Sequence, residues 1–121
     1  MNLFQLGRFT SHAGNELDWK IECDALTDED WECLAKMISE KTVFGSVYGI
    51  PRGGTKLANA LEKYCNPKSS IRLVVDDVWT TGKSMRDVIK GTDIGFVVFA
   101  RKRIEITPDL YVRALFTMEV L

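Results

Sequence analysis

Two continuous apolar runs constrain the fold of this chain more than any other feature of its sequence. Residues 71–75 are almost entirely apolar, and residues 94–100 carry no polar side chain at all. A strand that is apolar on both sides has to be buried on both faces, which is typical of a parallel sheet between layers of helices. The chain has 121 residues, the length of one domain. We therefore expect a single α/β domain over residues 1–121, built on a parallel sheet.

Segments with helical periodicity separate these runs. Thr27 can cap a helix in which Trp31, Leu34, Ala35 and Ile38 recur at i, i+3, i+4 and i+7, a buried stripe. Further helices are expected at residues 55–64 and 84–90, and strands at residues 17–21, 43–48, 71–75, 94–100 and 110–118. Residues 1–14 predict an irregular segment, and residues 76–83 a polar turn. Strands thus alternate with helices along most of the chain.

Composition excludes several classes of protein. The formal net charge is -1, from 16 basic and 17 acidic side chains, so non-specific nucleic-acid binding is not expected. The sequence has no apolar run long enough for a membrane span and no N-terminal signal-peptide pattern. The three cysteines form no CxxC pair, which predicts reduced thiols in the cytoplasm and neither a zinc site nor a disulfide framework. His12 is the only histidine, so a mechanism that needs two histidines is excluded.

The run at residues 71–75 leads into two adjacent carboxylates, Asp76 and Asp77, and then into a turn rich in hydroxyls. Gly82 permits a tight turn, and amides at the following helix start can bind a phosphate. The two carboxylates can accept hydrogen bonds from sugar hydroxyls or help to place a hydrated Mg²⁺. A helix-capping turn is the plain alternative. A nucleotide-triphosphate P-loop is rejected, because that pattern requires glycine where Asp77 stands.

Residues 74–84, Val-Val-Asp-Asp-Val-Trp-Thr-Thr-Gly-Lys-Ser, resemble the phosphoribosyl-pyrophosphate (PRPP) signature of type I phosphoribosyltransferases. The resemblance implies a compact version of that fold, with a PRPP-binding core at residues 43–118 and a base-side region at residues 1–26. It implies that Asp76 and Asp77 are catalytic residues that contact the ribose hydroxyls. It also implies that the 5-phosphate is bound by Thr80, Thr81, Gly82, Lys83 and Ser84.

A glycine-rich loop follows the strand expected at residues 43–48. Its glycines expose backbone amides, and Arg52 adds a fork of donors suited to phosphate oxygens. On its own the loop could be a turn with an exposed arginine. Beside the PRPP signature it resembles the family's pyrophosphate loop, with Mg²⁺ between pyrophosphate and ribose and Arg52 as a catalytic residue. The residues implied are Tyr48, Gly49, Ile50, Pro51, Arg52, Gly53 and Gly54.

Residues 7–14 and 19–22 are similar to the opening of orotate phosphoribosyltransferases. The resemblance implies contacts to the base from His12 and Lys20, although a lone histidine in an irregular segment is often simply exposed. Arg101 matches an arginine that faces the base in those enzymes, whereas a run of basic residues alone is usually solvated surface. Orotate or another pyrimidine is therefore the expected acceptor.

Full-length relatives place a mobile catalytic loop between the pyrophosphate loop and the PRPP signature. Here one expected helix and a turn fill residues 55–70, which leaves no room for such a lid. The favoured hypothesis is a phosphoribosyltransferase that uses Mg²⁺ and PRPP. The alternatives are a non-catalytic sensor of PRPP or a nucleotide, and a hydrolase or phosphorylase with a related site. By family analogy we expect a homodimer, with Trp79, Phe4 or Phe9 as contacts.

Overall fold

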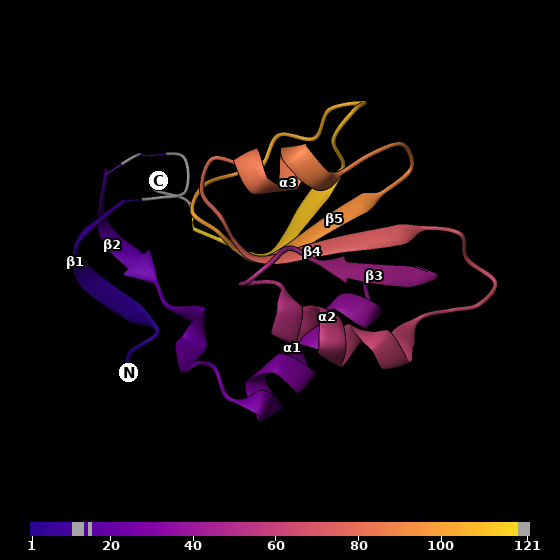
Figure 1. Cartoon of the computed structure of the whole chain (residues 1–121), viewed down its shortest axis with the longest axis horizontal. Helices are drawn as coiled ribbons and strands as arrows, with labels where there is room; N and C mark the ends of the chain where they lie inside the picture. The colour runs from indigo at the N-terminus through magenta and orange to yellow at the C-terminus, as the bar shows by residue number, and fades with distance from the viewer. Residues whose placement is uncertain (11–13, 15, 119–121) are drawn as a thin grey trace.

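The computed structural model describes residues 1–10, 14 and 16–118, and it contains two sheets (Figure 1). His12 lies outside the described residues. The main sheet has the order β3-β4-β5-β6, and every neighbouring pair is parallel. This confirms the expected α/β fold with a parallel sheet. The strands are β3 Ser46–Gly49, β4 Arg72–Trp79, β5 Ile94–Ala100 and β6 Val112–Thr117.

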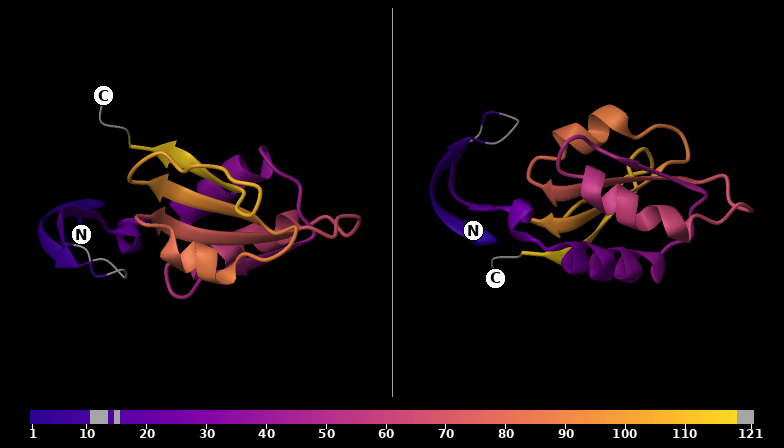
Figure 2. Two further views of the ribbon diagram at one scale, coloured as in Figure 1. Left: turned by 90° about the horizontal axis from the view of Figure 1, so that it is seen from above. Right: turned by 60° about the horizontal axis from the view of Figure 1, so that its bottom comes forward.

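Helices cover both faces of the main sheet, as the apolar runs predict (Figures 1 and 2). On one face, α1 (Asp28–Ser39) and α2 (Thr55–Leu61) pack against Leu73, Val75 and Phe96. On the other face, α3 (Lys83–Val88) and the segment of residues 101–111 cover Val74 and Val97. The apolar residues 73–75 of β4 and 95–100 of β5 are thus buried.

The two helical crossover connections of the main sheet have opposite hands. β3, β4 and β5 are parallel and adjacent in that order. The helix α2, which joins the first pair, covers one face, whereas α3, which joins the second pair, covers the other. Two crossovers that step in the same direction share a hand only if their helices lie on the same face. Since about 98% of such connections are right-handed, one of these two belongs to the rare left-handed kind.

The expectation of an irregular segment at residues 1–14 is wrong. β1 (Phe4–Thr10) pairs antiparallel with β2 (Glu16–Ile21) in a separate two-stranded sheet. The strand expected at residues 17–21 is therefore present, but outside the parallel sheet. The pairing shifts between Leu6 and Phe9, and this irregularity masks the alternation that would reveal β1. The hairpin lies beside the end of the main sheet to which the strand arrows point (Figure 2).

Several element boundaries differ from the expectations. A capping box at Thr27 starts α1, as predicted, but the helix expected at residues 55–64 divides into α2 and a short 3-10 helix, η2 (Glu62–Tyr64). β3 begins only at Ser46. β4 continues to Trp79, so the polar turn expected from residue 76 is instead strand. A further 3-10 helix, η1 (Cys23–Ala25), links β2 to α1. Among the described residues, no helix has the length and apolar character to cross a membrane.

Candidate functional site

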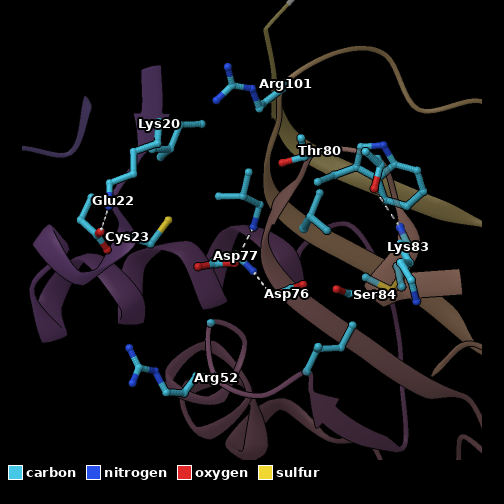
Figure 3. Close-up of a pocket in the computed structure, with 18 of the residues that line it drawn as sticks. Lys20, Glu22, Cys23, Arg52, Asp76, Asp77, Thr80, Lys83, Ser84 and Arg101 are labelled. Carbon is cyan, nitrogen blue, oxygen red and sulfur yellow. Dashed lines mark hydrogen bonds and ion pairs between the residues drawn. The ribbon is translucent and has the colours of Figure 1, made fainter. Parts of the chain in front are cut away.

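A pocket of about 1050 Å³ lies between the hairpin and the carboxyl ends of β3 and β4 (Figure 3). In open parallel sheets, ligands bind at this edge. The two chemical loops picked out from the sequence both contribute to its walls. Its lining includes Lys20, Ile50, Pro51, Arg52, Gly53, Asp76, Asp77, Thr80, Thr81, Gly82, Lys83, Ser84 and Arg101.

The paired carboxylates lie where the regular alternation of β4 slips. Val75 and Val78 both face α1 and α2, although a regular strand would place them on opposite faces. The Asp77 amide donates to Asp76 Oδ1 at 2.8 Å, and the Val78 amide donates to Asp77 Oδ1 at 2.8 Å. The local backbone thus fixes both side chains. In Figure 3 the Asp77 carboxylate is directed toward Cys23, and that of Asp76 toward Ser84.

Burial raises the pKa of Asp76 to about 8, with smaller contributions from the hydrogen bond and charge of Asp77. The Asp76 carboxyl therefore keeps its proton at neutral pH while the pocket is empty of cations. A bound cation or a set of donors would favour the ionised form and release this proton. The pair is thus suited to a ligand that supplies positive charge or hydroxyl donors.

The hydroxyl-rich turn after β4 is tightly packed. Gly82 has a φ of +83°, and a Cβ there would lie 2.2 Å from Trp79 Cζ2. The Thr81 hydroxyl accepts from the Lys83 amide at 3.4 Å, while Lys83 Nζ pairs with Asp87 at 2.7 Å. Trp79 is only 5% exposed. It is therefore not the exposed self-association contact expected from the sequence.

The glycine-rich loop reaches the same pocket. A Cβ on Gly53 would lie 2.5 Å from Cγ and from both carboxylate oxygens of Asp77, so the loop backbone rests directly on that carboxylate. The Ile50 amide donates to the Val75 carbonyl at 2.9 Å and ties the loop to β4. Arg52 is exposed and has no ion pair among the described residues. The peptide bond between Pro51 and Arg52 is cis.

The structure does not bring the whole predicted pyrophosphate set into the pocket. Tyr48 points to the α3 face instead, where Arg72 lies 5.6 Å from its ring centroid. Gly49 and Gly54 pack against each other, and a Cβ on Gly49 would lie 2.3 Å from the Gly54 carbonyl oxygen. These two glycines shape the loop without lining the pocket. Only residues 50–53 of this set line its wall.

On the hairpin side, the predicted base contacts already have protein partners. Lys20 Nζ pairs with Glu22 at 2.9 Å and lies 4.8 Å from the Phe9 ring centroid. Arg101 Nη1 donates to the Trp19 carbonyl at 2.7 Å, and its guanidinium lies 3.5 Å from the centroid of the Trp19 ring. Burial lowers the pKa of Arg101. Both cations line the pocket. Lys20 belongs to β2 of the hairpin, and Arg101 contacts Trp19 of the same strand.

Two buried pocket residues have no signal in the sequence. Cys23 is 3% exposed, and burial, together with the charge of Asp77, raises the pKa of its thiol, so it stays protonated. Trp31 is 4% exposed, and its Nε1 finds no hydrogen-bond partner among the residues that the structure describes. A lone cysteine and a helix-stripe tryptophan are ordinary core residues by pattern. Only the tertiary structure places them at a pocket.

The fit of Mg²⁺ to the site follows from the donor set. No group of three histidine, cysteine, aspartate or glutamate side chains could bind a metal ion in the described part of the chain. Glu22 and Asp24 also line the pocket, but they form no group of three ligands with the adjacent pair Asp76 and Asp77, so the described residues make no protein-only cage. Mg²⁺ usually keeps several waters and binds through one or two carboxylates together with substrate phosphates. The residues present fit that second arrangement.

No protein-family model and no curated protein matches this chain. Solved structures do resemble it. An orotate phosphoribosyltransferase from Aeropyrum pernix has a TM-score of 0.71 and 17% identity, over 96% of this chain and 89% of that one. A phosphoribosyltransferase from Corynebacterium diphtheriae has a TM-score of 0.64 and 15% identity, over 93% and 89%.

A UMP synthase from Leishmania donovani also matches, with a TM-score of 0.73 and 13% identity, over 96% of this chain and 34% of that one. Identities this low establish the shared fold, and the site residues are a separate question. The parallel four-stranded sheet, the helices on both faces and the pocket at the carboxyl ends all agree with the match. The chain therefore has the fold of the type I phosphoribosyltransferases, in a compact single-domain form.

Proposed function

We propose that this chain binds PRPP together with Mg²⁺ and transfers its phosphoribosyl group to a nitrogen base, with pyrophosphate as the leaving group. The observation that carries the proposal is the contact between Gly53 and the Asp77 carboxylate. It joins a glycine-rich loop suited to pyrophosphate to a carboxylate suited to ribose. A ligand with both groups on adjacent carbons would fit across this contact.

The roles of individual residues follow from their positions. Asp76 and Asp77 accept hydrogen bonds from the ribose hydroxyls, and residues 80–84 bind the 5-phosphate. Arg52 and the amides of its loop stabilise the charge that grows on pyrophosphate as the bond at C1 of the ribose breaks. A base nitrogen forms the new bond to C1. Mg²⁺, when bound, supplies positive charge against the pyrophosphate oxygens.

The acceptor is expected to be a pyrimidine such as orotate. Arg101 uses Nη1 for the Trp19 carbonyl and has other guanidinium donors directed elsewhere. An acidic base would suit it, because it has no carboxylate partner among the described residues. Of the other two contacts that the resemblance implies, Lys20 lines the pocket and His12 lies outside the described residues.

Isothermal titration calorimetry with PRPP and Mg²⁺ tests the binding step. Asp77→Asn is expected to weaken binding by at least about tenfold, since each hydrogen bond to a charged group contributes about 1.5–3 kcal/mol. Asp109→Asn removes the same charge from an exposed position and serves as the control. Equal affinity of wild type and Asp77→Asn would refute the ribose assignment. Release of pyrophosphate that depends on orotate, uracil or a purine then tests transfer.

A non-catalytic sensor of PRPP or a nucleotide is the second candidate. The observation that favours it is the connection between β3 and β4, which after the glycine-rich loop of residues 50–54 consists of α2, η2 and the turn of residues 65–71. None of those elements crosses the pocket, except the first turn of α2, at Thr55 and Lys56. A site without a lid excludes water poorly, which favours binding over turnover. Tight PRPP binding without base-dependent pyrophosphate release would identify the sensor.

We further propose a homodimer in the cytoplasm. Phe4 is 55% exposed and Leu6 is 91% exposed, so the hairpin presents apolar side chains to solvent. Phe9, the other contact expected from the sequence, is half-buried beneath Lys20. All three cysteines are free, as in a reducing compartment. Sedimentation velocity at micromolar concentration should show a dimer, and a monomer at every concentration would remove this proposal.

A further inference from the structure

The loop between β4 and α3 lies directly on an aromatic ring. Gly82 adopts a left-handed φ of +83°, and its Cα is so close to the Trp79 indole that a Cβ would collide with it. Trp79 ends β4 and is buried, and its carbonyl accepts from the Arg101 amide at 3.0 Å. One side of the loop is thus fixed by a rigid platform. Residues 80–84 of the loop and helix start line the pocket.

Arg86 contacts this loop from outside the pocket. Its Nη1 donates to the Thr81 carbonyl at 2.6 Å, and its guanidinium lies 5.2 Å from the Trp79 ring centroid. Arg86 is exposed, and it does not belong to the pocket lining. It therefore connects the loop backbone to the Trp79 indole without occupying the pocket.

The side chain of Lys83, the other basic residue of α3, does not contact the loop in this way. Lys83 Nζ lies 2.7 Å from the Asp87 carboxylate, an i,i+4 pair on the exposed surface of the helix. Lys83 lines the pocket, but among the described residues its side chain makes no hydrogen bond to the loop backbone. Arg86 is thus the charged side chain of α3 that bonds to the loop carbonyl.

The position of the Thr81 carbonyl has a consequence for the next amide. A trans peptide unit is planar, so its C=O and N–H point in opposite directions. Because the Thr81 carbonyl points to Arg86, outside the pocket, the N–H of Gly82 points away from Arg86. A donor that is already oriented costs less entropy when a ligand binds.

We propose that Arg86 is a positioning residue, which orients the Thr81–Gly82 peptide so that the loop can bind a phosphate group. This inference rests on the proposed function, in which residues 80–84 bind the 5-phosphate of PRPP. Arg86 does not contact the ligand in this assignment. It acts through the Thr81 carbonyl, and the Trp79 ring holds its guanidinium in place.

Calorimetry with two probes tests the role, because each probe reports on a different loop. Ribose 5-phosphate should depend on the loop of residues 80–84, whereas Mg²⁺-pyrophosphate should bind at the glycine-rich loop. Arg86→Met keeps the aliphatic stem and removes the guanidinium. It is expected to weaken ribose 5-phosphate binding roughly tenfold and to leave pyrophosphate binding within about twofold. Arg86→Lys keeps the charge and a single donor nitrogen. Its affinity for ribose 5-phosphate should lie between those of wild type and Arg86→Met.

Lys90→Met is the matched control, because it removes one positive charge just beyond α3 from an exposed side chain. It should leave both affinities unchanged. If Lys90→Met reproduces the loss, the effect is a general one of charge and the positioning role is refuted. Equal loss of both probes in Arg86→Met, or loss of neither, also overturns it.

A measurement without ligand separates this inference from the proposed function. Nuclear magnetic resonance relaxation should show that the Thr81 and Gly82 amides become more mobile in Arg86→Met and keep wild-type mobility in Lys90→Met. Unchanged mobility in Arg86→Met refutes the positioning role. If mobility rises as expected but wild type binds no ribose 5-phosphate, the positioning role of Arg86 is supported and the phosphate assignment of the proposed function is refuted.

Discussion

The position of Asp76 suits ligand binding but lowers the stability of the folded chain. The carboxyl group is buried enough to hold its proton at neutral pH, yet it lies at the edge of the pocket beside a second carboxylate. Two adjacent acids in a stable core would normally be replaced by neutral residues. Their presence here has a cost in stability, and a ligand with hydroxyl donors or a cation would remove that cost.

The pH dependence of stability should report this cost. The pKa of Asp76 is about 8 in the folded chain and close to 3.8, the ordinary value of an aspartate, in the unfolded chain. Between these values the folded state binds a proton that the unfolded state has lost. Stability therefore falls as pH rises toward 8, by at most about 1.4 kcal/mol per pH unit from this group. Urea denaturation at pH 5, 6.5 and 8 measures the slope.

Asp76→Asn should flatten that slope and raise stability at pH 8, because the amide keeps the shape of the side chain and never ionises. Asp87→Asn changes an exposed carboxylate on α3 and should retain the wild-type slope. A slope that survives unchanged in Asp76→Asn would show that another group controls it.

Gly53 offers a second test at the same scale. A methyl group there would lie 2.5 Å from the Asp77 carboxylate and force it out of its position. Gly53→Ala is therefore expected to weaken binding of Mg²⁺-PRPP by at least about tenfold and to preserve the fold. Calorimetry and circular dichroism measure the two quantities.

Gly91→Asn is the control for this change. Gly91 has a φ of +58°, which asparagine tolerates, and open space around it. Undiminished PRPP affinity in Gly53→Ala would mean that the two loops do not share a ligand.

Among the elements, the hairpin depends on Arg101. The hydrogen bond to the Trp19 carbonyl and the stacked ring link β2 to the end of β5. Arg101→Ala should weaken docking of the hairpin by about 1–3 kcal/mol. Trypsin should then cut faster at Arg8 and Lys20. Unfolding of the main sheet should change little, since its core excludes this contact.

Lys102→Ala removes the neighbouring exposed charge and should leave the cleavage rate at the wild-type value. If Arg101→Ala is cut no faster than wild type, the hairpin is held by other contacts.

The elements also show what the sequence can and cannot predict. The strand at residues 94–100 and the start of α1 at Thr27 agree with the structure, because an apolar run and a capping box are local signals. β1 was not predictable, since its pairing shift breaks the alternation and its partner β2 is the main source of its order. The extension of β4 through Asp77 was missed because its polar residues resemble a turn. Pairing with the neighbouring strand β5 keeps these residues in an extended conformation.

The candidate site follows the same division. The sequence alone marks Asp76, Asp77 and both loops, because their order after a strand is a local pattern. The sequence does not show that Tyr48 turns to the other face or that Arg86 reaches back to the Thr81 carbonyl. Those contacts depend on how β3 and α3 pack against β4.

For the molecule as a whole, the opposite hands of the two crossovers agree with the absence of a lid. Suppose that a strand and the lid beside it are removed from a regular βαβ arrangement. The helix that followed the first strand then stays on the same face of the sheet, while the next strand in the chain pairs with the opposite edge of that first strand. The connection then changes hand. In this chain α2 covers the face that it shares with α1, and β4 lies next to β3. Apart from the strand ends and the two loops, the pocket is lined by the hairpin, by η1, by Trp31 of α1 and by the first turn of α2.

This organisation predicts two levels of stability in one chain. Leu73, Val74 and Val98 in the central strands have no exposed surface, so amides of β4 and β5 should exchange with solvent only through global unfolding. The hairpin joins the rest of the chain through few elements: Arg101 on Trp19, Phe4 on Phe99, and Ile21, which is buried in the same core cluster as Phe99. Its amides should exchange through local opening, with free energies several kcal/mol lower.

Native-state hydrogen exchange measures both levels, and α1, which packs on the core through Trp31 and Ile38, should follow the main sheet. Mg²⁺-PRPP should slow exchange in the hairpin more than in β5, because a ligand in the pocket adds contacts to β2, which supplies Leu17, Lys20 and Ile21 to its wall. Hairpin amides as slow as those of β5 in the free protein would mean that the two sheets unfold as one unit. The hairpin could then not move independently to admit a ligand.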